Sequence, residues 1–396
     1  MSPAHAVYRL AASLGARLLG LSPVVESVYV HRSVSTGEVS FGRSDIDLLV
    51  IVRTPRGESA DGAELAALYR WLRLVRLGNP ALNHIEIHDR IRMERWIRVD
   101  TYRGSQDRRS AIRLYGKPIE WKRMTVRPED AVRRFSFWAE RFFSTAVCER
   151  NRRNLRKITL EMWCASATAV GRIEEPCLTR PEMAARWAES DQAPLLASMT
   201  GDPFRAPSVV FRLARQLHDS LLPPLRALHE PLTIPLLVPP RYRRRTLVVL
   251  PDADSPLPRE AFQPGSFLCT PEVFHLCLHY QNPFLSWVCP PQLRALGMRA
   301  PTRAEFVRAG LYFGLDGAVW NPGFQNPDTW TPAATIAVIR HALPCLEAGR
   351  VPPPLDDALA ARLAADRPSV TEYYRRVFPH LYRESEEQWE RLTRLP

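Results

Sequence analysis

The sequence predicts an α+β protein in which a unit of alternating strands and helices precedes a mostly helical region. Short β-branched or alternating runs are interleaved with helical periodicity up to about residue 124. Beyond that point helical periodicity dominates and prolines become frequent. A chain of 396 residues is long enough for two or three domains. The predicted divisions are residues 1–124, a helical domain over 125–228 that covers the cleft, and a proline-rich connection with a helical region over 229–396.

The N-terminal elements follow from local pattern. Apolar residues recur at helical spacing from Ala4 to Leu21, and Ser22-Pro23 then ends the helix. Val24 to Val30 is β-branched and aromatic, which predicts a strand. The further predicted elements are a strand from Asp45 to Val52, a helix from Glu64 to Leu77, a strand from His84 to His88 and a strand from Ala111 to Tyr115.

The remainder is predicted to be largely helical. Residues 129–173 indicate one or two long helices, and residues 180–228 continue with helical spacing. Prolines are dense over 223–264, where only Thr246 to Leu250 resembles a strand. Helices dominate again from residue 271 onward.

Bulk composition points to an ordinary soluble protein in a reducing compartment. The seven cysteines are scattered without a CxxC pair, which favours reduced thiols and a cytoplasmic location. No apolar run approaches the ~20 residues of a membrane span, so no membrane partner is expected. The net charge of +12 is compatible with a nucleotide or nucleic-acid partner. The oligomeric state is left open by the sequence.

Two acidic residues open the most apolar predicted strand. Asp45 and Asp47 are two positions apart, so strand geometry places both carboxylates on one side and Ile46 and Leu48 on the other. Adjacent carboxylates repel unless a cation lies between them. Hard oxygen ligands suit Mg²⁺ or Mn²⁺. The alternative is a pair of solvated acids at a strand end.

The segment around these acids resembles the signature of the DNA polymerase β-like nucleotidyltransferase superfamily. That signature is a strand, a Gly-Ser turn, a short helix and then Ser-Asp-X-Asp on the next strand. Here Ser33 occupies the serine position, Gly37 follows four residues later, and Ser44-Asp45-Ile46-Asp47 matches the metal motif. Leu114-Tyr115-Gly116 also resembles bacterial small-molecule nucleotidyltransferases, including the aminoglycoside type. The resemblance covers roughly the first 120 residues and none of residues 125–396.

The turn departs from this signature at one position. The superfamily has glycine before the serine, whereas this chain has Arg32. Glycine permits positive φ and a close approach of the backbone to phosphates. Arg32 would either obstruct that approach or grip the phosphates with its guanidinium. A site that has lost activity is therefore one of the hypotheses.

A third carboxylate is expected on a neighbouring strand, because two-metal chemistry generally needs one. In the strand from His84 to His88, Glu86 faces away from Ile85 and Ile87. We favour Glu86 over Asp89, which should lie beyond the strand on the other face. The alternative is an edge strand with a merely polar face.

The resemblance implies roles for these residues. Asp45, Asp47 and Glu86 would bind Mg²⁺ or Mn²⁺, and Glu86 could also take a proton from the acceptor. Arg32, Ser33, Gly37 and Ser44 would lie at the nucleotide. A basic residue such as Lys157, which shares a helix face with Arg153 and Arg156, could reach the triphosphate, although a solvated surface is the favoured reading there.

The function implied by the resemblance is transfer of a nucleoside monophosphate, with AMP from ATP preferred. The acceptor would be a hydroxyl of a small molecule or protein, and pyrophosphate would leave. Template-independent addition of nucleotides to a nucleic-acid 3′ end is the second hypothesis. A catalytically inactive nucleotide-binding or interaction protein is the third, and Arg32 is its main support.

One further cluster favours structure over function. His275 and His279 lie four residues apart, as zinc ligands can. Their neighbours Phe274, Leu276 and Leu278 are apolar, so core packing is the preferred interpretation.

Overall fold

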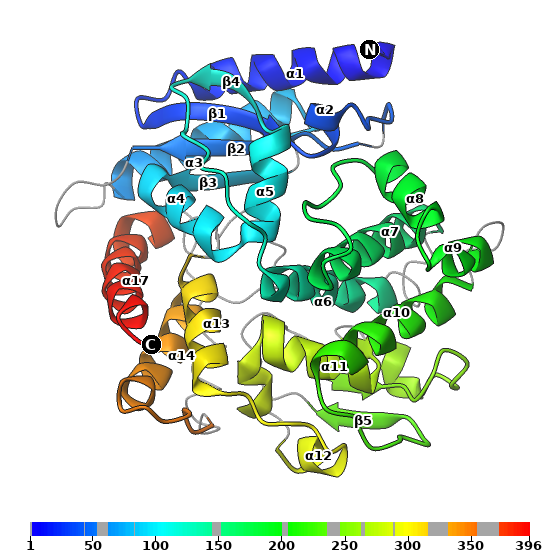
Figure 1. The fold of residues 1–396 in the computed structure, drawn as a ribbon. Coiled ribbons are helices and arrows are strands. Elements are labelled where there is room, and N and C mark those ends of the chain that lie inside the picture. Colours follow the sequence, from blue (N-terminus) through cyan, green and yellow to red (C-terminus); the bar gives the residue numbers. More distant parts are fainter. Residues whose placement is uncertain are drawn as a thin grey trace. The chain divides into compact units, whose positions relative to one another are not determined.

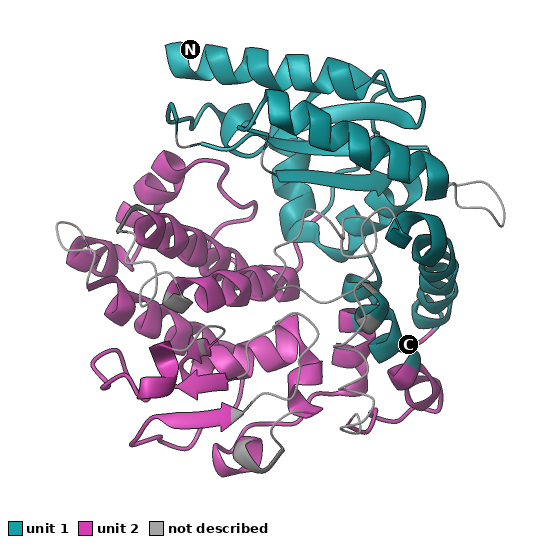
Figure 2. Cartoon of the chain, turned by 180° about the vertical axis from the view of Figure 1, so that it is seen from behind, with its two compact units in different colours: residues 1–124, 310–340, 365–394 teal, residues 125–309, 341–364, 395–396 magenta. Residues whose placement is uncertain are grey.

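The chain forms two compact units in the computed structural model (Figure 2). Unit 1 contains residues 1–124, 310–340 and 365–394, and unit 2 contains 125–309, 341–364 and 395–396. The structure describes the whole chain except residues 1, 43, 54–61, 83, 145–151, 200–204, 236–245, 263–265, 288–289, 316–331 and 355–371. Among the residues described, no helix combines the length and apolarity needed to span a bilayer.

The α+β class is confirmed by a mixed four-stranded sheet in unit 1 (Figure 1). Its strands stand in the order β3-β2-β1-β4. Strand β1 is antiparallel to both neighbours, whereas β2 and β3 are parallel. The four strands are β1 (Val25–His31), β2 (Asp47–Val52), β3 (His84–Asp89) and β4 (Ile112–Gly116).

All four predicted strands of unit 1 are therefore present, with one informative shift. Strand β2 begins at Asp47, whereas the sequence predicted a start at Asp45. Asp45 lies in the irregular segment before the strand and is exposed, while Ile46 is fully buried. Asp45 is therefore presented from a loop end, without the ladder hydrogen bonds that fix Asp47.

The predicted N-terminal helices are confirmed, and two more are found. Helix α1 (Pro3–Leu19) begins at the cap Ser2, whose side chain accepts a hydrogen bond from the His5 backbone N–H. The other helices of this region are α2 (Ser33–Thr36), α3 (Gly62–Gly78), α4 (Arg90–Val99) and α5 (Thr101–Ser110). Helices α4 and α5 were not predicted.

The two faces of the sheet differ in chemistry. Val28 and Val30 of β1, with Leu48 and Val50 of β2, join the core formed with α1 and α3. Since side chains alternate along a strand, the residues between them point to the opposite face. That opposite face carries His31, Asp47 and Glu86. The opposite face thus combines these polar side chains with the buried apolar residues Leu49 and Ile51.

The C-terminal segment returns to unit 1. Helix α17 (Phe378–Thr393) contributes Phe378 to the core cluster, and the Tyr382 hydroxyl donates to Asp89 Oδ2 at 3.1 Å. Asp89 ends β3 and also caps α4 by accepting from the Arg92 backbone N–H at 2.7 Å. Contacts between residues about 290 positions apart explain why unit 1 is discontinuous in sequence.

Unit 2 is mostly helical, as the sequence predicted. The long helices expected over 129–173 are α6 (Pro128–Ser144) and α7 (Arg152–Ala169). The other helical segments up to residue 295 are α8 (Arg180–Ala188), α9 (Ala193–Met199), α10 (Ala206–Leu221), η3 (Arg259–Phe262), α11 (Pro271–Leu276), η4 (Cys277–Gln281), η5 (Pro283–Trp287) and α12 (Pro290–Ala295). Helices α13 (Arg303–Leu315) and α14 (Pro332–Glu347) run across the division between the units, and η6 (Tyr373–Val377) precedes α17.

The proline-rich stretch contains a small second sheet. Its order is β5-β6-β7, with strands Leu232–Pro235, Thr246–Val249 and Ser266–Cys269. Only β6 was predicted. Strand β5 is an edge strand that ends in Pro235, and edge strands are where sheets tolerate proline. The predicted domain limit at residue 228 remains a prediction.

Candidate functional site

Asp47 and Glu86 lie on the face of the unit 1 sheet opposite α1 and α3, whereas Asp45 precedes the strand. Asp47 pairs with His31 of β1 and with His84 of β3, and Glu86 pairs with Leu49, two residues beyond Asp47. Because the side chains of Asp47 and Leu49 point the same way, Glu86 shares a face with Asp47. Asp47 is 8% exposed. The structure therefore brings Asp47 and Glu86 together through strand register.

A guanidinium group joins these two carboxylates. Arg32 Nη1 donates to Asp47 Oδ1 at 3.0 Å, and Nη2 of the same side chain donates to Glu86 Oε1 at 2.9 Å. Two donors of one planar group thus engage two acids from neighbouring strands. Arg32 supplies the positive charge that the sequence predicted a metal ion to supply.

Arg32 also has an unusual backbone. Its φ of 59° is positive, and it is the one non-glycine residue with positive φ in the described part of the chain. L-amino acids avoid this region because Cβ collides with the backbone, and the strain is about 1–3 kcal/mol. Arg32 thus retains the backbone geometry of a glycine turn while adding a long cationic side chain.

A second arginine holds Glu86 from the other side. Arg103 of α5 donates through Nη2 to both oxygens of Glu86, and its contact to Oε1 is 2.5 Å. His84 Nε2 lies 2.7 Å from the same Oε1. Burial would raise the pKa of Glu86, but the charges of Arg103 and Arg32 and the His84 contact outweigh it and hold that pKa well below its usual range. Glu86 is therefore ionised at neutral pH.

A buried histidine–aspartate pair supports Arg103. His31 Nδ1 lies 3.1 Å from Asp107 Oδ1, and Arg103 Nε lies 3.5 Å from Asp107 Oδ2. Burial would raise the pKa of Asp107, but His31 and Arg103 lower it overall. The pair locks α5 onto the end of β1, and this fixes where Arg103 meets Glu86.

The loop residues predicted to bind nucleotide surround this cluster. Ser33 is the first residue of α2, and its hydroxyl lies 3.4 Å from the Asp45 carbonyl oxygen. Gly37 ends α2 in the left-handed conformation, with φ of 82°. Ser44 Oγ accepts from the Ser40 backbone N–H at 2.8 Å and so shapes the turn before Asp45. Their predicted nucleotide-binding roles remain predictions.

Lys157 belongs to unit 2. Its ammonium lies 5.6 Å from the centre of the Trp138 ring, within the α6–α7 pair. Arg156 on the same helix is exposed. The predicted role of Lys157 at a triphosphate remains a prediction.

The predicted metal ligands do not form a three-ligand group in this arrangement. Over the described residues, no three His, Cys, Asp or Glu side chains are gathered closely enough to hold a metal ion. Asp47 and Glu86 both contact the Arg32 guanidinium, and Asp45 lies in the segment before the strand. The carboxylate oxygens of Asp47 and Glu86 are suitable ligands for a divalent cation, but only after the Arg32 guanidinium has moved away.

Some residues of this cluster carried no sequence signal. Arg103 and Asp107 lie on α5, whose sequence TYRGSQDRRS has little apolar periodicity and contains Gly104. Their spacing of four residues was the available clue, because it places both on one helix face.

Comparison with known proteins adds little to these observations. No family model matches the sequence, and no curated protein matches it. Among solved structures, a spectinomycin adenyltransferase, AAD(9), from Enterococcus faecialis, determined with ATP and spectinomycin, aligns over 54% of this chain and 98% of its own. The identity is 16% and the TM-score is 0.34. At these values the site has to be judged on its own residues.

Proposed function

We propose that this protein transfers a nucleoside monophosphate, preferably AMP from ATP, to a hydroxyl group of a small molecule or protein. The observation that carries the proposal is that Asp47 and Glu86 share one sheet face and both contact the Arg32 guanidinium. This geometry is combined with a serine turn and a Ser-Asp-X-Asp segment at the same strand end. Two fixed carboxylates with a shared cation are the elements that a triphosphate site needs.

The reaction assigns distinct work to the chain's own groups. The acceptor hydroxyl oxygen forms a bond to the α-phosphorus while the bond from that phosphorus to the pyrophosphate oxygen breaks. Glu86 would receive the hydroxyl proton after Arg32 has left it, because loss of that cation raises the pKa of Glu86 from its depressed value. Ser33 and the neighbouring backbone would hold the terminal phosphates. When bound at Asp45, Asp47 and Glu86, Mg²⁺ or Mn²⁺ would supply charge neutralisation for the triphosphate.

Arg32 must move for this chemistry to occur. Its guanidinium contacts both carboxylates, at the place that the nucleotide's cation would occupy. The Arg32 side chain is 39% exposed, so it has room to swing toward solvent or toward a phosphate. We propose that Arg32 leaves Asp47 and Glu86 and binds the triphosphate when nucleotide arrives.

The second candidate is a catalytically inactive nucleotide-binding or interaction protein. It is favoured by the same Arg32 contacts, because a side chain that permanently neutralises Asp47 and Glu86 leaves no need for a metal ion. The absence of a three-ligand group among the described residues also agrees with it. The two candidates differ in whether Arg32 can be displaced.

A label-transfer experiment tests the proposal. The protein is incubated with α-labelled ATP, GTP, CTP or UTP and Mg²⁺ or Mn²⁺, with a panel of aminoglycosides, with proteins and with RNA as acceptors. We expect a labelled small-molecule or protein product that is lost in Asp47→Asn and Glu86→Gln. The matched control is Glu387→Gln, an exposed acid on α17. A product that survives both site substitutions would exclude this site, and labelled RNA would favour 3′-end addition.

A further inference from the structure

Helix α1 exposes two leucines on the side that faces away from the core. Its buried stripe is made by Tyr8 and the small residues Ala12 and Ala16, together with Leu19. By contrast, Leu10 is 73% and Leu14 is 58% exposed. An amphipathic helix normally buries its leucines and exposes its polar residues. The outward leucines of α1 therefore indicate a surface that another molecule covers.

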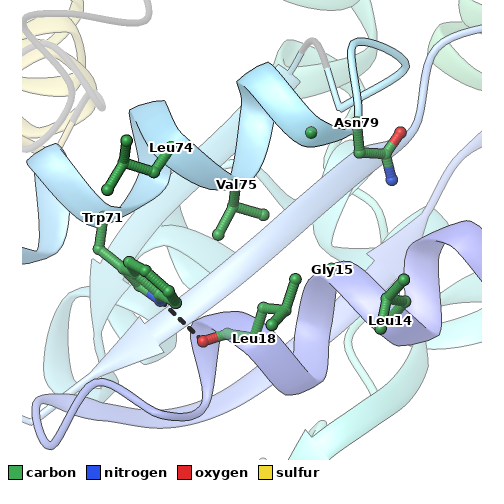
Figure 3. Close-up of a pocket in the computed structure, with 8 residues that line it drawn as sticks. Leu14, Gly15, Leu18, Trp71, Leu74, Val75 and Asn79 are labelled. Carbon is green, nitrogen blue, oxygen red and sulfur yellow. Dashed lines mark hydrogen bonds between the residues drawn. The ribbon is translucent and has the colours of Figure 1, made fainter.

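Helix α3 continues the same surface. Leu74 is 58% and Leu77 is 81% exposed near its C-terminal end. Between the two helices lies a cavity of about 180 Å³ (Figure 3). Its lining comes from α1, α3 and the residue after α3: Leu14, Gly15, Leu18, Trp71, Leu74, Val75, Gly78 and Asn79. We call this the α1–α3 groove.

The groove offers a ligand apolar contact. The Trp71 indole N–H already donates to the Leu18 carbonyl at 2.7 Å, and the Asn79 amide donates to the Ala11 carbonyl at 3.3 Å. These two side-chain donors of the walls are thus engaged within the protein. A largely apolar cavity of this size accommodates one large aliphatic or aromatic side chain. The groove is therefore suited to a ridge of apolar side chains.

The charges beside the groove have one sign. Arg17 lies three residues after Leu14 and Arg70 lies four residues before Leu74, so each is one helical turn from a groove leucine. Both arginines are exposed. Helix α1 has no acidic residue, and the acid of α3, Glu64, lies in its first turn, far from Leu74. A partner should bring carboxylates to the edges of its apolar ridge.

We propose that the α1–α3 groove binds an amphipathic helix of another protein that presents leucine-like side chains flanked by acidic residues. A second copy of this surface would bring Arg17 and Arg70 against the same arginines, which is unfavourable. A helix laid into a groove satisfies both the shape and the charge. This groove lies on the sheet face opposite Asp47 and Glu86, so the proposal does not depend on the proposed function.

A designed peptide serves as the probe. It is a fluorescein-labelled helix of about 18 residues with leucines three and four apart and glutamates flanking them. Two matched peptides replace the glutamates by lysines or the leucines by alanines. Fluorescence anisotropy with the full chain should show saturable binding of the acidic leucine peptide, at least about tenfold tighter than either matched peptide.

Variants of the protein test whether the peptide binds in the α1–α3 groove. The double variant Leu14→Gln and Leu74→Gln should weaken the acidic peptide about tenfold or more, and both leucines are exposed, so the fold should persist. Leu257→Gln, at a leucine that is 37% exposed outside the groove, should leave the affinity unchanged.

Three results would overturn the proposal. One is failure of the acidic peptide to bind, or binding with the same affinity to the double variant as to wild type. Another is dimerisation in sedimentation velocity that the double variant abolishes, because it would assign the groove to a second copy. The last is co-sedimentation with phosphatidylserine vesicles that the same variant abolishes, because it would assign the groove to a membrane surface.

Discussion

Replacing Arg32 by glycine is the most informative perturbation of the candidate site. The substitution removes two charge-assisted contacts, to Asp47 at 3.0 Å and to Glu86 at 2.9 Å. It also relieves a non-glycine residue at φ of 59°. If Arg32 occupies the place of a divalent cation, its removal should uncover a cation site.

The size of the effect follows from these contacts. Partly exposed ion pairs contribute roughly 0.5–1 kcal/mol each, so displacing Arg32 costs the metal about 1–2 kcal/mol. Removing that competition should tighten Mn²⁺ binding about 5- to 30-fold. Strain relief of about 1–3 kcal/mol offsets the lost contacts, so the melting temperature should stay the same or rise by a few degrees.

Two variants separate charge from strain. Arg32→Met removes the guanidinium but keeps a side chain at positive φ, so it should show the gain in Mn²⁺ affinity without the gain in stability. Isothermal calorimetry and the electron paramagnetic resonance of free Mn²⁺ measure the affinity without nucleotide, and calorimetric melting measures the stability. Unchanged Mn²⁺ affinity in both variants would refute the view that Arg32 competes with a metal ion at Asp47 and Glu86.

Three further outcomes are expected. Arg103→Met should lower the free energy of unfolding of unit 1 by about 3 kcal/mol near neutral pH, because the buried Glu86 loses a partner. Since the pKa of Glu86 in the folded protein is depressed, this loss of stability should shrink below about pH 4 in urea titrations. The pKa of His275 is lowered to about 3 by burial, aided by the nearby His279 and His218, so stability should fall as pH drops from 6.5 toward 3, and His275→Asn should flatten that decline in melts at successive pH values. Gly116→Ala should cost about 3 kcal/mol, because φ is 78° and the new Cβ would lie 1.9 Å from the Glu26 carbonyl oxygen; an unchanged denaturation midpoint would contradict this.

Protonation of the buried His275 should destabilise the folded protein as the pH falls. The His275 side chain is fully buried, its Nε2 accepts from the Arg299 backbone N–H at 3.2 Å, and its Nδ1 lies 2.9 Å from His218 Nε2. With Nε2 as acceptor, Nδ1 carries the proton and donates to His218. Between pH 3 and 6.5 the unfolded histidine binds a proton that the folded one refuses, so stability rises with pH in that window. The sequence interpretation of His275 and His279 as core residues is confirmed by their burial.

Strand periodicity carried most of what the sequence could predict. The runs that became β1, β2 and β3 are β-branched or alternating, and burial on a sheet enforces those patterns whatever the rest of the fold does. The same alternation predicted that Asp47 and Glu86 lie away from the apolar residues that precede and follow them in their strands. By contrast, α5 has almost no apolar stripe and is held by Asp107 and Arg103, so its helical form depends on tertiary contacts that periodicity does not encode.

The direction of a long side chain was beyond sequence reasoning. Arg32 could be recognised as a replacement for glycine, but both obstruction and phosphate binding stayed open. Its orientation toward Asp47 and Glu86 depends on strand register and on Arg103, both of which are set by the folded chain. Unit 1 likewise recruits α17 from the C-terminus through Tyr382 and Asp89, a pairing that local pattern does not reveal.

The central claim is that Asp47 and Glu86 form a site for a nucleotide with its cation. Calorimetric titration of Mn²⁺·ATP into wild type, Asp47→Asn and the control Glu387→Gln tests this most directly. We expect saturable binding in wild type and in the control, and affinity weakened at least about tenfold in Asp47→Asn. Equal affinity in all three proteins, or no binding of Mn²⁺·ATP to wild type and to Arg32→Gly alike, would contradict it.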